Sequence, residues 1–490
     1  MTPRENSIKL YRREGFMRPI RLISIALMAL TLFSCTPEHV KQPNVIFVFA
    51  DQWRASDLGY AGNTDVKTPH LDKLAKEGLN LSNTISTIPV CAPFRASLIT
   101  GQYALRHGVF YNDKPLKDEV TSIAEVYKAS GYKTAYIGKW HLNGAPEPDC
   151  EKDPFINRHK PVVKSRRQGF DYWKVLECTH DYNNSFYFDE NNQRHEWKGY
   201  DAFAQTNDAI SYIKNNTEIP FLLFLSWGPP HSPYKTAPEK YKKMYADSDI
   251  SLRPNVPEDK TEKAKEDLRG YYAHCSALDN CIGELQQAIE EAGIEENTIF
   301  VFTSDHGDMI YSHNQIKKQK PYDESIRVPF LLKYPRLFQQ ANEIKTPFAT
   351  ENIMPTLLSL SNLGIPETVE GKDFSTHLQG GKTDVNAALI SCPVPFHQWN
   401  RKKGGREYRG VRTERYTYVR DLNGPWLLFD NEKDPYQMNN LVDKQQHSNL
   451  QQELEKELQT LLAQTGDEFK SGEHYMDLWG YSWAPGDLNY

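Results

Sequence analysis

NVIFVFA at residues 44–50 decides the fold of this chain, because it is apolar on both faces of a β-strand. Such a strand is typical of a parallel sheet that helices cover on both sides. Further strands are predicted at KTAYIG (133–138), PFLLFLSW (220–227), TIFVFTSD (298–305) and VPFLLKY (328–334). Together these short runs predict one large sheet.

Helix-like stretches alternate with these strands. In TPHLDKLAKEG, Pro69 lies in the first turn and Gly78 at the end, which are typical start and stop signals. Further helices are expected at 121–130, 201–215, about 262–292 and 352–364. The alternation predicts an α/β fold with a large mixed, mostly parallel sheet flanked by helices.

The pattern changes near residue 386. REYRGVRTERYTYVRD (406–421) alternates aromatic and charged residues with period two, and WLLFD (426–430) follows the turn Asn423-Gly424. Residues 445–465 have the pattern of one amphipathic helix. We therefore expect a main domain at 43–385 and a smaller C-terminal subdomain at 386–490, built from an antiparallel sheet and a helix.

Composition excludes several classes of protein. Of the 490 residues, 39% are apolar and 25% charged, which suits a globular protein. Aromatic residues at 12% are too many for a disordered chain. The formal net charge of −6 gives no basic surface for nucleic acid, so no nucleic-acid partner is expected.

Residues 1–34 predict a signal peptide. Basic residues precede the apolar run LISIALMALTLF (22–33), which is too short to span a bilayer as a mature helix. The following Leu-Phe-Ser-Cys (32–35) resembles a bacterial lipobox. This resemblance implies cleavage before Cys35, a membrane-anchoring lipid on that cysteine, a linker at 35–42, and a place in the bacterial cell envelope, periplasmic or at the outer-membrane surface. An ordinary secretory signal or an uncleaved anchor is the alternative.

Polar residues follow three of the predicted strands. Asp51-Gln52 follows the first strand, Asp305-His306 ends another, and His231 comes after PFLLFLSW and a Gly-Pro-Pro turn. In open α/β sheets, ligands bind beyond the carboxyl ends of the strands. The oxygens of Asp51, Gln52 and Asp305 suit a hard cation such as calcium or magnesium. The alternative to a ligand site, for a single Asp-His pair at the end of one strand, is a helix-capping aspartate next to a surface imidazole.

CAPFRASLITG (91–101) is the strongest functional signal in the chain. It predicts a loop that opens a helix ending at Gly101, so Cys91 lies near helix N-terminal N–H groups, which favour an anion. Arg95 lies one turn further and supplies a fixed positive charge. A thiolate nucleophile is the first interpretation of Cys91.

CxPxR followed by LxTG resembles the signature of the formylglycine-dependent type I sulfatases, within the alkaline phosphatase superfamily. Other motifs of that family follow in the same order: FVFADQ (47–52), GKWHL (138–142), HSPY (231–234), TSDHGD (303–308) and KxxxYxESxRVP (318–329). The resemblance covers about residues 43–385, with a weaker match to the family's C-terminal subdomain. It implies a sulfuric ester hydrolase with an alkaline-phosphatase-like fold. The predicted lipid anchor favours a sulfated glycan sugar of a host or an alga as the substrate, because large sulfated polymers are met outside the cytoplasm.

The resemblance also implies a nucleophile and a metal site. Cys91 would be oxidised by a maturase to formylglycine, whose hydrate attacks sulfur. Asp51, Gln52, Asp305 and His306 would bind one calcium ion together with that hydrate.

Five further motif residues receive roles from the resemblance. Arg95 and Lys139 would hold the hydrate and the charge beside the metal. His141 would hydrogen-bond the hydrate and help to expel sulfate. Lys318 and His231 would face the sulfate ester, with His231 as proton donor to the leaving oxygen. Among the neighbouring lysines, Lys318 is chosen because it lies four residues before a tyrosine, as the family spacing expects.

Gln52 departs from the family pattern, which often has Asp at this position. Glutamine keeps a carbonyl ligand but removes one negative charge, so we expect the metal to be held less tightly. Gln52 leaves open a phosphonate monoester or phosphodiester hydrolase on the same scaffold. An alternative of another class is a glycan-binding lipoprotein with a dead site, against which the retained motif residues argue.

Five residues are candidate substrate contacts: Trp173, His180, Asp181, His397 and Arg401. The first three lie in a long irregular stretch, and loops of that length often line a pocket. His397 and Arg401 lie at the start of the C-terminal segment, together with Arg406 and Arg409. In relatives this segment often shapes the sugar pocket. The alternative for these four residues is a solvated surface position, and the alternative for Trp173 is structural packing.

The lipobox gives a first testable prediction. Cys35→Ser should block acylation and leave the signal unprocessed, because the thiol that would receive the lipid is gone. Fractionation of membranes from cells that make the parent or the variant tests this. The lipoprotein interpretation would be contradicted if the parent protein were soluble while the variant associated with membranes only through its apolar run.

Overall fold

The computed structural model describes residues 41–144 and 157–483. The predicted signal peptide and Cys35 lie outside the described residues, as does most of the linker. From Gln42 onward the chain forms one compact unit. Within the described ranges, no helix is both long and apolar enough to cross a bilayer.

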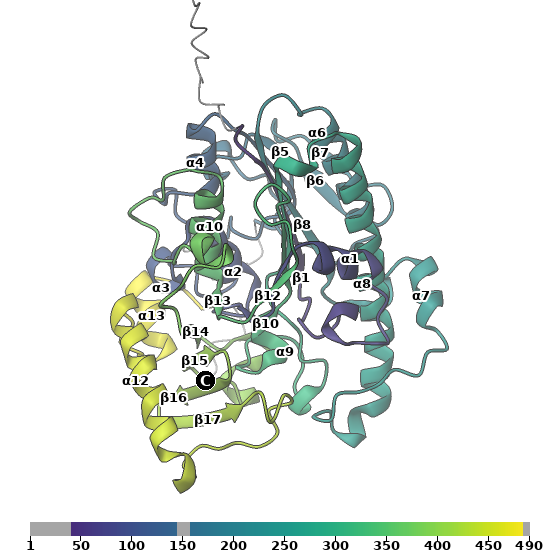
Figure 1. The fold of residues 1–490 in the computed structure, drawn as a ribbon. Helices are drawn as coiled ribbons and strands as arrows, with labels where there is room; N and C mark the ends of the chain where they lie inside the picture. Colours follow the sequence, from purple (N-terminus) through teal and green to yellow (C-terminus); the bar gives the residue numbers. More distant parts are fainter. Residues whose placement is uncertain (1–40, 145–156, 484–490) are drawn as a thin grey trace, which may run out of the picture. The chain divides into compact units, whose positions relative to one another are not determined.

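A ten-stranded sheet forms the centre of this unit (Figure 1). Its strands are β1 (Asn44–Asp51), β2 (Leu79–Leu81), β4 (Lys133–Lys139), β5 (Tyr172–Leu176), β6 (Phe186–Phe188), β7 (Arg194–Glu196), β8 (Phe221–Pro230), β9 (Thr298–Ser304), β11 (Phe330–Lys333) and β12 (Asn342–Ile344). Their order is β12-β2-β11-β9-β1-β8-β4-β5-β6-β7. The central run from β9 to β5 is parallel, whereas β11 and β6 join it antiparallel. The predicted mixed, mostly parallel sheet is confirmed.

Helices cover both faces of the sheet (Figure 1). Alternate residues of β1, starting at Ile46, pack in a cluster with α1 (Pro69–Glu77), α6 (Asp201–Lys214) and α8 (Thr261–Glu291). The other residues, starting at Val45, pack with α2 (Cys91–Thr100), α4 (Ile123–Ala129) and α10 (Ile353–Leu360). Every residue of β1 is buried, as its two apolar faces predict. The shorter helices are α3 (Ala104–His107), α7 (Glu239–Tyr245), α9 (Asp323–Ile326), α11 (Ser375–Leu378) and α13 (Gly472–Trp479).

The C-terminal part contains the predicted antiparallel sheet. Its strands are β14 (Ala387–Cys392), β15 (Tyr408–Thr413), β16 (Tyr416–Asp421) and β17 (Gly424–Asp430), paired in that order. The predicted helix, α12 (Ser448–Thr465), packs on this sheet through leucines at 454, 458 and 462. A three-stranded sheet joins β10 (Arg327–Val328), β3 (Thr84–Ile85) and β13 (Phe348–Ala349).

Two sequence-based expectations about strands are wrong. The run at 328–334 is not one strand, because Pro329 separates β10 from β11 and the two belong to different sheets. Proline has no backbone N–H to continue a ladder. The stretch around Trp173 is not irregular, because Tyr172–Leu176 forms β5 and extends the parallel sheet beside β4.

Arg409 neither lines the cavity at Cys91 nor lies on the solvated surface, the two positions considered for it from the sequence. Its side chain is fully buried, and its guanidinium forms an ion pair with Asp467 beyond the end of α12. The Tyr475 hydroxyl donates to the same carboxylate at 2.5 Å. Arg406, by contrast, is partly exposed and pairs with Asp421 at 2.7 Å. The buried pair therefore ties β15 to the C-terminal helices.

Arg409→Ala should destabilise the protein by about 3–5 kcal/mol, because it leaves Asp467 buried without its cation. Arg406→Ala is the control, with a smaller expected cost, because the Arg406 guanidinium is partly exposed and water can replace it at Asp421. Urea unfolding of both variants measures the difference in the free energy of unfolding. Equal losses in the two variants would contradict the structural role given to Arg409.

Candidate functional site

The parallel pairing of β1 with β9 sets the geometry of the site. Ala50 lies opposite Ser304, so the next residues, Asp51 and Asp305, emerge side by side at the carboxyl end of the sheet. Ligand atoms of Asp51, Asp305, His306 and Cys91 all lie within 4.8 Å of one another and are buried. Four residues from three distant parts of the sequence therefore form one cluster.

Cys91 is the first residue of α2, and its side chain faces this cluster. Its Sγ lies 2.9 Å from Lys318 Nζ, 3.3 Å from His306 Nε2 and 3.7 Å from an Asp51 carboxylate oxygen. Burial and Asp51 raise the pKa of the thiol, but the positive charges of Lys139, Lys318 and His306 outweigh them and hold the pKa well below its usual value. A nucleophilic atom at this position is therefore favoured in its anionic form.

Arg95 and Lys139 balance the two carboxylates. Arg95 donates through Nη2 to Asp305 at 3.0 Å and through Nη1 to Ser226 Oγ at 2.6 Å. Lys139 Nζ lies 2.5 Å from Asp51 Oδ2. All of these side chains are buried, so the charges interact with little screening by water.

The donor set fits a hard divalent cation. Asp51, Asp305 and Gln52 offer oxygen atoms, and Gln52 Oε1 is buried without a hydrogen-bond partner in the described part of the chain. The Nδ1 atom of His306 donates to the Gly307 carbonyl at 2.9 Å, so Nε2 is the ring nitrogen that faces the cluster, and a bound cation would take the place of its proton. Oxygen ligands with one imidazole suit calcium or magnesium better than a soft metal.

His141 lies beyond the end of β4, next to the cluster. Its Nε2 is 3.3 Å from Asp113, whose carboxylate also binds Arg158 in a bidentate pair. Burial lowers the pKa of His141, but neighbouring Cys178 and the hydrogen bond with Asp113 raise it to about 9. The imidazole is therefore positively charged at neutral pH.

A cavity of about 190 Å³ opens onto Cys91. Its walls include Lys139, His141, Lys318, His231 and His180. The rings of His180 and His231 stack with centroids 4.4 Å apart. Burial and the charge of Lys318 hold the pKa of His231 well below its usual value. The cavity thus joins the acidic cluster to a cationic wall, which suits an anionic ligand.

Comparison with known proteins identifies the family. Residues 43–363, about two thirds of the chain, match the sulfatase family. The chain belongs to the sulfatase family. Residues 312–464 also match the C-terminal region of N-sulphoglucosamine sulphohydrolase. The predicted family is confirmed, and the protein is an enzyme that hydrolyses sulfate esters.

Three relatives show how far the similarity of this sulfatase extends. An ulvan-active sulfatase of Formosa agariphila is 43% identical over 95% of this chain and 90% of its own length. An endo-4-O-sulfatase of Bacteroides thetaiotaomicron is 31% identical over 88% of this chain and 94% of its own. A solved structure from work on glycosaminoglycan metabolism by Bacteroides thetaiotaomicron has a TM-score of 0.79 and 29% identity, covering 91% of this chain and 100% of that one.

The structure brings all the motif residues of the sulfatase to one place, but it separates the five candidate substrate contacts. His180 and His397 line the cavity at Cys91. Asp181 is exposed and hydrogen-bonds Asn184, and Arg401 pairs with Glu407 and Glu473. Trp173 is fully buried against Tyr136 and Trp140 in the core, so packing accounts for its side chain.

Further residues line the cavity that sequence reasoning did not select: Asn112, Arg158, Cys178, Lys317, Phe396 and Gln398. They come from separate loops, and no spacing in the sequence marks them. Lys317 is one of the lysines next to Lys318 in the sequence. The structure directs Lys317 Nζ to the Ser232 hydroxyl and Lys318 Nζ to Cys91.

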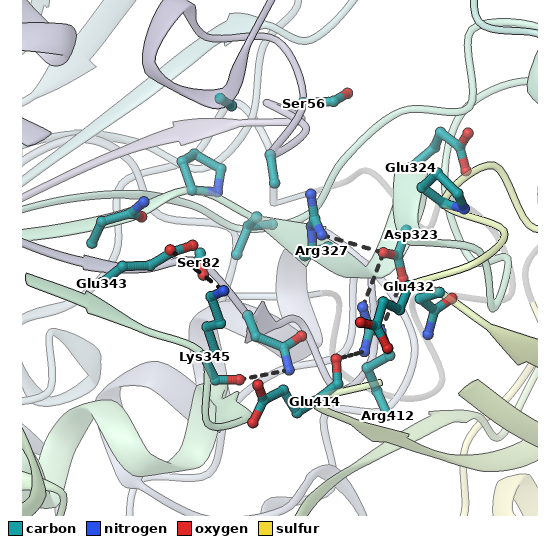
Figure 2. A pocket seen from close by; sticks show the side chains of 18 of the residues that line it. Ser56, Ser82, Asp323, Glu324, Arg327, Glu343, Lys345, Arg412, Glu414 and Glu432 are labelled. Atoms are coloured by element: carbon teal, nitrogen blue, oxygen red, sulfur yellow. Dashed lines mark hydrogen bonds and ion pairs between the residues drawn. The ribbon is translucent and has the colours of Figure 1, made fainter. Parts of the chain in front are cut away.

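A larger cavity of about 790 Å³ lies elsewhere on the sulfatase, and none of the predicted site residues lines it. Figure 2 shows several charged side chains of this cavity in pairs, Asp323 with Arg327 and Arg412, and Glu343 with Lys345. Arg327 and Arg412 both face Asp323, at 3.5 and 3.1 Å. Since Arg412 belongs to β15, these ion pairs brace the C-terminal sheet against α9, and we place the chemistry in the smaller cavity.

Proposed function

We propose that this sulfatase removes sulfate from a sugar of a sulfated glycan, with formylglycine at position 91 and one bound calcium ion. The observation that carries the proposal is the position of Cys91 Sγ, at the meeting point of the carboxylate cluster, Lys318 and the cavity. The names of the relatives, an ulvan-active sulfatase and an endo-4-O-sulfatase, support a glycan substrate. We further propose that a maturase modifies Cys91 and that a lipid on Cys35 anchors the enzyme in the bacterial cell envelope.

In the proposed enzyme, formylglycine hydrate at position 91 would supply the nucleophilic oxygen, and calcium would supply positive charge to the site. Asp51, Gln52, Asp305 and His306 would hold the ion. Lys318 binds the sulfate group opposite the carboxylates, since its ammonium already lies 2.9 Å from Sγ. Such charges are in place before the reaction, so they offset the charge that develops on the sulfate oxygens without reorganisation.

Four other residues hold the metal-site carboxylates or face the reacting groups. Arg95 fixes Asp305, and Lys139 fixes Asp51. His141, held by Asp113, presents a positive imidazole beside position 91 and can hydrogen-bond an oxygen there. His231 lies across the cavity and can protonate the leaving oxygen of the sugar.

Position 91 should carry formylglycine in active enzyme. Peptide mass spectrometry of active protein should show the thiol replaced by an aldehyde. Cys91→Ala should be inactive on sulfated monosaccharides and disaccharides while its circular dichroism spectrum matches that of the parent, because the residue serves in chemistry rather than packing. Full activity of protein with an unmodified thiol would rule out the proposed nucleophile.

Removal of the metal should abolish activity. Asp51, Gln52 and Asp305 are oxygen donors, so calcium should restore the chelated enzyme better than zinc. Sulfate release by exhaustively chelated enzyme, before and after each ion is added back, measures this. Undiminished turnover by protein shown to be free of metal would contradict the metal site.

His231→Ala should cost about 10²- to 10⁴-fold in kcat/KM on a sugar sulfate, which is the usual contribution of general acid catalysis. The loss on nitrophenyl sulfate should be far smaller, because nitrophenolate is weakly basic and leaves without a proton. The ratio of kcat/KM for parent and variant on the two substrates measures the effect. Equal losses would assign His231 to sulfate binding instead.

Comparison of an aryl sulfate with the matched aryl phosphonate tests the related chemistry that Gln52 leaves open. We expect the sulfate to be the better substrate, as the family membership indicates. A preference for the phosphonate ester would overturn the proposed reaction while leaving the site residues in their roles.

A further inference from the structure

Asp308 lies next to the residues proposed to bind the metal, and it has no part in the chemistry described so far. It follows His306 by two residues and is fully buried. Its Oδ2 accepts a hydrogen bond from Gln52 Nε2 at 2.6 Å and another from the Tyr234 hydroxyl. Its Oδ1 accepts from the backbone N–H groups of Ile310, at 3.1 Å, and Lys317, at 3.0 Å. These four donors, all within the described part of the chain, are neutral.

The contact with Asp308 fixes the orientation of the Gln52 amide. A carboxylate accepts only, so the amide must direct its NH₂ group to Asp308 and its oxygen the other way. That oxygen is the buried Oε1 without a hydrogen-bond partner among the described residues. A glutamine side chain offered to a cation needs this orientation, since the nitrogen cannot act as the ligand.

The backbone of Gln52 is also held in an uncommon conformation. Its φ is 73°, in the left-handed region that non-glycine residues rarely adopt. Its N–H donates to Asp305 Oδ1 at 3.0 Å, and its carbonyl accepts from the Tyr271 hydroxyl at 2.7 Å. Strained backbones of this kind persist where surrounding contacts over-determine them, often at functional sites. Asp308 completes these contacts at the side chain.

Asp308 also supplies a charge that Gln52 lacks. A glutamine ligand contributes no negative charge to the metal site, whereas the buried carboxylate of Asp308 lies one hydrogen bond behind it. A hydrogen bond to an anion polarises the amide and increases the negative charge on its oxygen. Partners behind metal ligands tune affinity in this way.

The same carboxylate reaches the lysine segment. Lys317 has a left-handed backbone, with φ of 61°, and its N–H donates to Asp308. The Lys317 carbonyl accepts from the Met309 N–H at 2.8 Å, which closes a loop from 308 to 317. Lys318, which contacts Cys91, is the next residue. One side chain therefore connects a metal ligand with the segment that carries Lys318.

We propose that Asp308 is a positioning residue, which turns the Gln52 oxygen toward the cation, adds the negative charge that Gln52 lacks and anchors the segment before Lys318. This inference rests on the metal site of the proposed function. It does not depend on the nature of the substrate.

Calcium titration of metal-stripped protein by calorimetry tests the proposal. Asp308→Asn should weaken calcium binding by about 10- to 100-fold, the usual cost of losing a partner behind a metal ligand. Tyr234→Phe is the matched control, because it removes a hydrogen bond to the same Oδ2 but keeps the carboxylate and its bond to Gln52. Its calcium affinity should stay much closer to that of the parent.

A charge exchange separates positioning from a general structural role. In the double variant Gln52→Glu/Asp308→Asn the carboxylate is at position 52, facing the metal, and the amide is at position 308, behind it. The hydrogen bond is restored, but position 308 now donates and position 52 accepts. This double variant should bind calcium more tightly than Asp308→Asn, whereas Gln52→Glu alone, with two carboxylates in contact, should not. Such non-additivity is the signature of a direct interaction. Circular dichroism verifies the fold of each variant.

The outcomes are distinct for the two proposals. Parent-like calcium affinity in folded Asp308→Asn, or a double variant no better than Asp308→Asn, overturns the role of Asp308 and leaves the proposed function intact. A parent protein that binds neither calcium nor magnesium overturns the metal site itself, and the inference with it.

Discussion

The parallel pairing of β1 with β9 is the constraint on which the site depends, because it places Asp51 and Asp305 side by side in a buried position. Two adjacent carboxylates without water are costly unless cations compensate them. Arg95 and Lys139 supply this compensation, the first from α2, a helix packed on the sheet, and the second from β4, a strand within it. The chemistry of the site and the assembly of these elements are therefore coupled.

Much of this arrangement could be predicted from the sequence. The two apolar faces of NVIFVFAD identify a central strand, and the polar residues after three strands predict which side chains meet. Such patterns are local, so periodicity and strand ends reveal them. The family motifs added Lys139, His141 and Lys318, whose positions no periodicity would single out.

What could not be predicted depends on contacts between distant loops. Trp173 looks like a loop residue because YWKVL is short, and only its pairing with β4 shows that it is buried. Arg409 looks exposed because its strand alternates charged and aromatic residues. Its side chain is nevertheless buried, because it forms an ion pair with Asp467, which lies 58 residues later in the sequence. Arg158 and Asn112 reach the cavity from loops without a recognisable pattern. In each case the partner is far away in sequence.

The charges of the site also explain how an anionic substrate can assist its own reaction. Near Cys91, the positive charges of Arg95, Lys139 and Lys318 outnumber the negative charges of the two carboxylates. This surplus favours an anion at Cys91 even before the charge of a metal ion is counted. The same surplus keeps His231 neutral, since burial and Lys318 lower its pKa. In the proposed reaction, a sulfate ester bound between Lys318 and His231 would add a negative charge beside the imidazole and raise its pKa. His231 would then gain the proton that the leaving oxygen needs only when an anionic substrate is in place.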